Sequence, residues 1–180
     1  LIITTPSYVA DQDRYGRLTQ TGRMTLAELD AHALNVVEKQ EDWYCPLPLL
    51  AEYKGTQIRV VFRSLSPLVI DADDPFQAGT SAGFQVVGTD RPIEIVSVSV
   101  APDDPATLII CCDYEPSGAS SRLLHAVACA PTTDQRPINR SAIRDSWQAN
   151  GQTQILHRWA LPADLPLHPA GHPKLVEQLQ

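Results

Sequence analysis

Six short segments rich in β-branched residues follow one another between residues 57 and 130, and turn residues close each of them. Val, Ile and Thr favour strands, whereas Asp, Pro and Gly interrupt them. The chain also has 15 prolines against 9 glycines, which favours short strands over long helices. The segments read QIRVVFRS, SPLVID, AGFQVVG, IEIVSVSVA, ATLIICCDY and RLLHAVACA.

Hydrophobic and polar side chains alternate along these segments. Ile58, Val60 and Phe62 fall on one face of the first segment, and the same alternation recurs over residues 95–100. One buried and one solvated face are typical of antiparallel sheets. Residues 122–129 are apolar on both faces, which indicates a central strand. We therefore predict a mainly β fold, an antiparallel β-sandwich or jelly roll.

One amphipathic helix is predicted before this β region. Thr25 and Glu28 form the pattern of a capping box, and apolar residues then recur at helical spacing to about Lys39. An apolar run over residues 1–5 predicts a strand, so strand, loop and helix read as the end of an α/β unit. Because the chain opens inside this run, we expect a fragment of a longer protein. Prolines after Asp42 indicate a domain boundary near that residue.

The C-terminal part is expected to complete the β domain. Residues 137–152 read as a long polar loop and residues 154–161 as the last strand. Residues 166–180 read as a tail with a short helix from Lys174.

Charge and composition exclude some partners. The net charge is −7, the isoelectric point is near 5.1 and no basic stripe occurs, so we expect no nucleic-acid partner. No apolar run approaches the roughly 20 residues of a membrane span, so no membrane insertion is expected. The cysteines are expected as buried reduced thiols, and a pairing of Cys112 with Cys129 stays open. We expect no cofactor.

The stretch DRYGRLTQTGRMTLAELDA resembles the last block of SGNH/GDSL-type hydrolases. In that block an Asp-x-x-His pair precedes Leu-Thr, a Gly and a helix, and here Leu18, Thr19 and Gly22 match in order. The later pieces WYCPLPL, IRVVF, PLVID, GFQVV, AIRDSW and WALPADLPL are similar to phage-encoded members of the group. The resemblance covers most of residues 1–167 and implies a C-terminal β-sandwich of the kind carried by phage tail, neck or decoration proteins and by carbohydrate esterases.

The resemblance implies three parts and an incomplete catalytic site. Residues 1–41 would be the end of an SGNH-like α/β unit, residues 42–165 the β-sandwich and residues 166–180 a tail. Arg17 stands where the family has its catalytic His, and an Arg cannot act as a general base at neutral pH. The family's Gly-Asp-Ser nucleophile block is absent from these residues, so we assign no catalytic residue.

Arg140, Arg144, Asp145 and Trp147 form a candidate glycan-binding loop. Arg and Asp can hydrogen-bond sugar hydroxyls while an indole ring stacks on a pyranose. The alternative is structural: Arg144 and Asp145 pair to hold the loop, and Trp147 packs on the sandwich.

Two further sets of side chains are weaker candidates. Asp71, Asp73 and Asp74 could offer oxygen ligands to calcium, although Asp also stabilises turns. Asp164 and His168 echo the Asp/His block but are four residues apart instead of three, and we interpret them as part of a surface tail.

Three functions follow as hypotheses. The first is a non-catalytic structural or adhesin module of a phage virion, with other virion proteins or further copies of itself as partners and a host surface polysaccharide as a candidate ligand. The second is the C-terminal part of an esterase that deacetylates surface polysaccharide. The third is a carbohydrate-binding accessory domain of a secreted bacterial enzyme.

Overall fold

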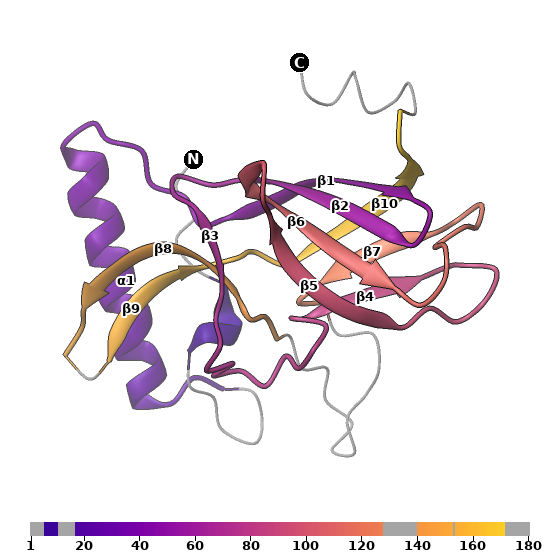
Figure 1. The fold of residues 1–180 in the computed structure, drawn as a ribbon. Coiled ribbons are helices and arrows are strands. Elements are labelled where there is room, and N and C mark those ends of the chain that lie inside the picture. The colour runs from indigo at the N-terminus through magenta and orange to yellow at the C-terminus, as the bar shows by residue number, and fades with distance from the viewer. Residues whose placement is uncertain (1–5, 11–16, 128–139, 153, 172–180) are drawn as a thin grey trace.

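Two β-sheets and one long helix make up the described part of the chain (Figure 1). The computed structural model describes residues 6–10, 17–127, 140–152 and 154–171. A seven-stranded sheet has the order β4-β7-β10-β1-β2-β6-β5, and a three-stranded sheet has the order β3-β8-β9. The fold is therefore mainly β, as the alternating pattern predicts. It is consistent with a β-sandwich, and nothing in the strand order singles out a jelly roll.

The seven strands of the large sheet come from both ends of the described chain. They are β1 (Leu47–Lys54), β2 (Gln57–Arg63), β4 (Phe84–Val87), β5 (Ile95–Ala101), β6 (Asp104–Cys112), β7 (Arg122–His125) and β10 (Ala163–Pro169). The sheet curls, so that β4 and β7 face β2 and β6 (Figure 1). The predicted domain end at residue 165 falls inside β10.

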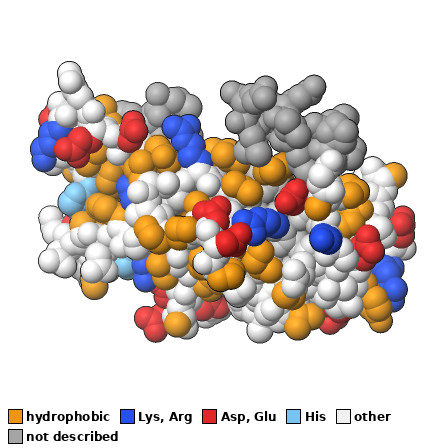
Figure 2. All heavy atoms as spheres, turned by 45° about the horizontal axis from the view of Figure 1, so that its top comes forward, with side chains coloured by type: hydrophobic (Ala, Val, Ile, Leu, Met, Phe, Trp, Pro, Cys, Tyr) orange, Lys and Arg blue, Asp and Glu red, His pale blue; other side chains and the backbone are white. Residues whose placement is uncertain are grey.

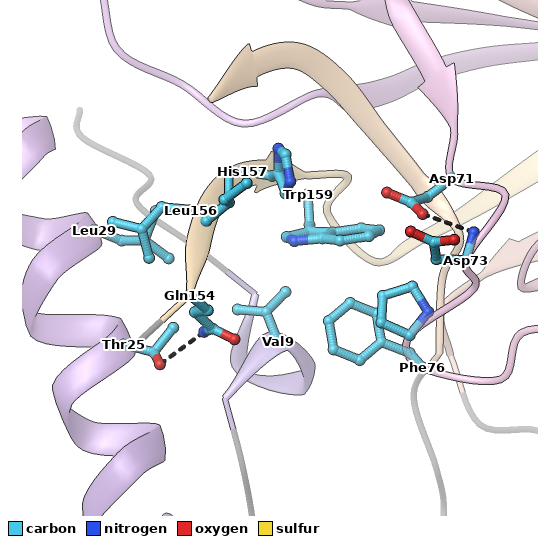
Figure 3. A pocket seen from close by; sticks show the side chains of 12 residues that line it. Val9, Thr25, Leu29, Asp71, Asp73, Phe76, Gln154, Leu156, His157 and Trp159 are labelled. Atoms are coloured by element: carbon cyan, nitrogen blue, oxygen red, sulfur yellow. Dashed lines mark hydrogen bonds between the residues drawn. The ribbon is translucent and has the colours of Figure 1, made fainter. Parts of the chain in front are cut away.

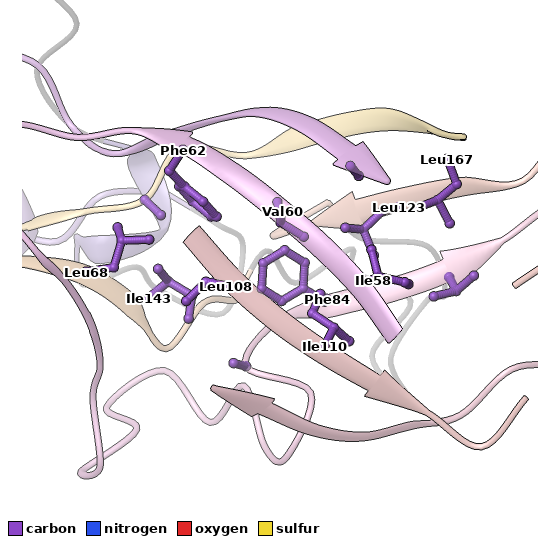
Figure 4. Close-up of a cluster of buried hydrophobic side chains, with 14 of the residues drawn as sticks. Ile58, Val60, Phe62, Leu68, Phe84, Leu108, Ile110, Leu123, Ile143 and Leu167 are labelled. Carbon is purple, nitrogen blue, oxygen red and sulfur yellow. The ribbon is translucent and has the colours of Figure 1, made fainter. Parts of the chain in front are cut away.

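The main core lies inside this curl. Ile58 and Val60 of β2 are fully buried opposite Ile110 and Leu108 of β6, with which they are in register. Figure 4 shows side chains of β2, β4, β6, β7 and β10 pointing into the same space, with Phe84 at its centre. The period-two prediction for the first segment is confirmed, because one face of β2 packs on this core and the other does not.

One strand pair of the large sheet is parallel. Ala51 of β1 is in register with Leu167 of β10, and the two strands run in the same direction. The other pairs among the described strands are antiparallel. The sheet is thus mixed rather than wholly antiparallel, because a crossover through the small sheet brings β10 back beside β1.

The small sheet contains a strand that we predicted as a loop. It consists of β3 (Leu68–Ile70), β8 (Ile143–Asn150) and β9 (Ile155–Trp159). The polar loop prediction for residues 137–152 is wrong over β8, because the charged side chains of this strand are buried in internal ion pairs. The strand predicted over residues 154–161 is confirmed as β9.

The long helix starts earlier than the capping-box pattern predicts. Helix α1 spans Gln20–Glu38, after a short 3-10 turn (η1, Ser7–Val9), and its N-cap is Thr19. The hydroxyl of Thr19 accepts a hydrogen bond from the Gly22 N–H at 3.1 Å. A start at Thr25 is therefore wrong, and that residue lies buried inside the helix.

Helix α1 covers the small sheet rather than the large one (Figure 1). Leu29 packs in a second hydrophobic cluster with Val9, Leu156 and Trp159. Among the described helices, none is long and apolar enough to cross a membrane. The strand predicted over residues 1–5 and the helix predicted from Lys174 lie outside the described residues.

Candidate functional site

The four residues of the predicted glycan loop lie on or just before β8, and each contacts other parts of the protein. Arg140 donates from Nη1 to the Gln77 carbonyl at 3.1 Å. Arg144 donates from Nε to Asp71 Oδ2 at 2.6 Å, and both side chains are mostly buried. These contacts join β8 to the loop that follows β3.

Asp145 forms a buried ion pair with Arg158 of β9. Arg158 Nη2 lies 2.7 Å from Asp145 Oδ2, and the two side chains are 6% and 0% exposed. Asp145 Oδ1 also accepts the Trp147 backbone N–H at 3.1 Å. Burial raises the pKa of Asp145, and the charge of Arg158 opposes that rise.

The ring of Trp147 packs against other aromatic rings. It meets Trp43 edge to face at 4.9 Å between centroids and His32 at 5.6 Å. The Arg158 guanidinium lies 5.4 Å from the Trp43 ring centroid and 5.5 Å from that of Trp147. Trp43 is buried, and a saccharide could reach Trp147 only at the part of its ring that the packing leaves exposed.

The acidic run after β3 builds turns. Asp71 Oδ1 accepts the Asp73 N–H at 3.0 Å, and the Asp74 carboxylate accepts the N–H groups of Ala78 at 2.7 Å and Gly79 at 2.8 Å. Within the described ranges, no group of three or more His, Cys, Asp or Glu side chains is arranged to hold a metal ion. The carboxylate oxygens of Asp71 and Asp74 therefore accept hydrogen bonds within turns, which is the role that the turn interpretation gives them.

A histidine and a serine meet in the core at His125 of β7. Its Nε2 lies 2.9 Å from Ser141 Oγ and its Nδ1 lies 3.0 Å from the Leu161 carbonyl. The carbonyl can only accept, so the neutral ring donates from Nδ1 and accepts from the Ser141 hydroxyl. Both side chains are buried, at 1% and 0% exposure, so this pair is sealed from solvent.

The other candidate residues also lie in structural positions. Asp164 accepts from Arg122 Nε at 2.6 Å, and His168 follows four residues later on β10. Cys45 and Cys112 are buried thiols, and burial raises the pKa of Cys112 to about 11. Cys129, whose pairing with Cys112 the sequence leaves open, lies outside the described residues.

A cavity of about 230 Å³ lies between α1, β9 and the loop after β3. We call it the helix–hairpin cleft. Its apolar lining includes Val9, Leu29, Phe76, Leu156 and Trp159. In Figure 3 the rings of Trp159 and Phe76 lie on one side of this space, and Leu29 and Leu156 lie on the other. The two rings pack edge to face with their centroids 4.8 Å apart, and together they form an aromatic wall of the cleft.

Polar side chains converge on the same cleft from three segments. They are Thr25 of α1, Asp71 and Asp73 of the loop after β3, and Gln154 and His157 around β9. Gln154 Nε2 donates to the Thr25 hydroxyl at 2.9 Å, which leaves the carboxamide oxygen of Gln154 as a further acceptor (Figure 3).

Two titratable groups of the cleft have shifted pKa values. Burial alone would raise the pKa of Asp71, but hydrogen bonds from Arg144 and from the Asp73 N–H outweigh it and lower that pKa. Burial lowers the pKa of His157, and the nearby charge of Arg144 lowers it further. At neutral pH the cleft therefore contains an ionised Asp71 and a neutral imidazole.

A second hollow, of about 680 Å³, lies at the outer ends of β7 and β10. Its lining includes Tyr53, Arg122 and His168, but most of it is the Gly118–Ser121 turn and the prolines of β10. It brings one aromatic ring to its surface, whereas the helix–hairpin cleft combines several rings with convergent polar groups. The smaller cleft is thus the better candidate site.

Sequence reasoning missed most of the cleft. Thr25 was interpreted as a cap and Gln154 as the first residue of the last strand, and Phe76 was assigned no role. The alternation of Ile155, His157 and Trp159 was the one available signal, because it placed an imidazole and an indole on one face of a strand.

No protein-family model matches the sequence, and no curated protein matches it. Among solved structures, the fold is similar to the crystal structure of the N-terminal part of the bacterial S-layer protein SbsC, with a TM-score of 0.44 and 12% sequence identity. The similarity covers 85% of this chain and 29% of that chain. A likeness this weak carries no conclusion about function. The resemblance to SGNH hydrolases stays a prediction.

Proposed function

We propose that this chain is a non-catalytic attachment module that holds a saccharide in the helix–hairpin cleft. The observation that carries the proposal is the combination of an aromatic wall, Trp159 with Phe76, and convergent hydrogen-bonding groups in one cavity. Saccharides present apolar C–H faces and polar hydroxyls, so a site for them needs both surfaces. The volume of about 230 Å³ suits one sugar ring of a longer chain.

The polar groups of the cleft match the hydroxyls of a sugar. The carboxamide oxygen of Gln154 and the carboxylate of Asp73 accept hydrogen bonds, and the hydroxyl of Thr25 can do both. Ile155 is 56% exposed beside the cleft and extends its apolar surface toward solvent. A polysaccharide could therefore enter with one ring inside and its neighbours along β9.

The role in attachment rests on the resemblance to phage-encoded proteins with C-terminal β-sandwiches. We place the module on the outside of a virion, where it would contact a host polysaccharide and neighbouring virion proteins. Figure 2 shows acidic and basic side chains interspersed among hydrophobic ones on one face, without a field of a single sign. Such a surface suits contacts with other proteins as well as solvent.

Calorimetric titration of the chain with oligosaccharides from host surface polysaccharides tests the proposal, after a glycan array has identified a binder. Phe76→Leu removes the ring but keeps an apolar side chain, and we expect binding to weaken at least about tenfold. The matched control is Tyr114→Leu, because Tyr114 is 45% exposed on a different part of the surface. Equal losses in both variants, or none in Phe76→Leu, would contradict the proposed site.

An activity measurement distinguishes the esterase alternative from the non-catalytic proposal. Hydrolysis of p-nitrophenyl acetate by the parent protein, if it is robust and lost on mutation of a serine, would overturn the non-catalytic proposal. We expect no turnover above background, and none gained in Arg17→His.

A further inference from the structure

The charges around the helix–hairpin cleft are unevenly distributed. Among the described residues that line the cleft there is no Lys or Arg, and the formal charges in this set are the carboxylates of Asp71 and Asp73. Asp71 is neutralised by Arg144, whose Nε lies 2.6 Å away behind the cleft wall. His157 is neutral near pH 7, because burial lowers its pKa. Among the described lining residues, the carboxylate of Asp73 is therefore the charge that no opposite charge balances.

Asp73 is placed to meet a ligand. Its side chain is exposed, and within the described part of the chain it forms no ion pair. Its backbone N–H donates to Asp71 Oδ1 at 3.0 Å, so the turn fixes the position of the residue without using its carboxylate. In Figure 3 Asp73 lies on the side of the cleft where Phe76 lies.

A carboxylate next to an aromatic wall discriminates among sugars by charge. A hexosamine with a free amine places an ammonium group where a neutral sugar has a hydroxyl or an acetamide, and an ammonium pairs with a carboxylate. A uronic acid or a phosphorylated sugar would meet Asp73 as a like charge, in a chain whose net charge is already −7.

We propose that the helix–hairpin cleft selects saccharides that carry a free amino group and disfavours acidic saccharides. This inference rests on the proposed saccharide-binding function and names its ligand class. Asp73 supplies the charge, and the rings of Phe76 and Trp159 supply the surface that any pyranose would use.

Calorimetry with three matched oligosaccharides tests the inference on the full chain at low salt: glucosamine oligomers, their N-acetylated counterparts and oligogalacturonate. We expect the free amine to bind about fivefold more tightly than the acetylated form, since an exposed ion pair contributes at most about 1 kcal/mol. Oligogalacturonate should bind most weakly. The preference should shrink as salt is raised, because the pair is exposed.

Asp73→Asn should abolish the preference, so that the aminated and acetylated oligomers bind with the same affinity. Glu115→Gln is the matched control, because it removes the same charge from an exposed residue outside the cleft. Equal binding of aminated and acetylated oligomers, or a preference that survives Asp73→Asn, would overturn the amine inference and leave the saccharide site standing. Absence of binding to all three, and to every glycan on an array, would overturn both.

Discussion

The carboxylate of Asp145 and the guanidinium of Arg158 lie 2.7 Å apart in the small sheet, where their side chains are 0% and 6% exposed. A second pair, Arg122 with Asp164, has a similar distance of 2.6 Å, but its side chains are 45% and 48% exposed. The two pairs share their chemistry and differ in burial. They therefore separate the contribution of burial from that of the ion pair itself.

Asp145→Asn should destabilise the protein by about 3–5 kcal/mol, because it leaves the buried charge of Arg158 uncompensated. Asp164→Asn should cost less than about 1 kcal/mol. The double variant Asp145→Leu/Arg158→Met should lose far less than the sum of its single variants. Urea unfolding followed by Trp fluorescence measures these variants and the two single variants of the double against the unsubstituted protein. Equal costs for the buried and exposed pairs would contradict this account.

The buried imidazole of His125 predicts a loss of stability in acid. Burial lowers its pKa to about 4 in the folded protein, whereas an unfolded chain has the ordinary value near 6.5. Between these values only the unfolded state binds the proton, so the free energy of unfolding falls as the pH falls through this window. Between a pH above both pKa values and a pH below both, this group lowers the free energy of unfolding by about 3 kcal/mol.

His125→Gln tests this prediction, because an amide can keep hydrogen bonds to Leu161 and Ser141 without titrating. Urea unfolding of both proteins between pH 7.5 and 4.0 should give a shallower pH dependence for the variant. Carboxylates contribute equally to both curves, so the difference isolates the imidazole. Parallel curves would show that His125 is protonated in the folded state as readily as in the unfolded one.

The N-cap of α1 predicts that truncation of Thr19 costs more than truncation of a threonine inside the helix. Thr19→Ala removes the hydroxyl that accepts the Gly22 N–H and should cost about 1 kcal/mol. Thr21→Ala alters an exposed position inside the helix, where alanine is a better helix former, so it should cost little or nothing. Thermal unfolding followed by circular dichroism distinguishes them. A neutral Thr19→Ala would favour the later helix start.

Gly83 occupies a position that alanine cannot fill without rearrangement. Its φ is +89°, and an added Cβ would lie 2.2 Å from the Arg140 carbonyl oxygen. Gly83→Ala should cost about 3 kcal/mol, since backbone strain and overpacking add. Gly55 has φ +59° with no heavy atom within 4 Å of an added Cβ, so Gly55→Ala should cost about 1 kcal/mol. Similar melting temperatures for both variants would contradict the close approach.

The large sheet was predictable where one face of a strand meets the core. Ile58, Val60 and Phe62 alternate because β2 has a buried and a solvated face, and that period is visible in any short window. The strand β8 was not predictable in this way. Arg144 and Asp145 look like surface residues until Asp71 and Arg158 are beside them, and no local pattern contains those partners.

The helix start was predicted wrongly and the cleft was missed for a related reason. Thr25 and Glu28 have the spacing of a capping box, but they bind the turn between β8 and β9 through Gln154 and the Gln152 N–H. The cleft joins η1, α1, the loop after β3 and β9, which are far apart in the sequence. Helix and strand propensities describe single segments of the chain. The helix start and the cleft depend on tertiary contacts instead, so propensity could not predict them.

The parallel pairing of β10 with β1 has a consequence for the order of assembly. Of the described strands, β10 is the last to be synthesised, and it alone pairs the β4–β7 group with the β1–β2–β6–β5 group. Until it arrives, β7 and β1 each present an open edge of unpaired N–H and C=O groups. We expect the nascent chain to be most prone to aggregation just before β10 leaves the ribosome. Closure of the sheet then depends on contacts between distant residues, which form slowly.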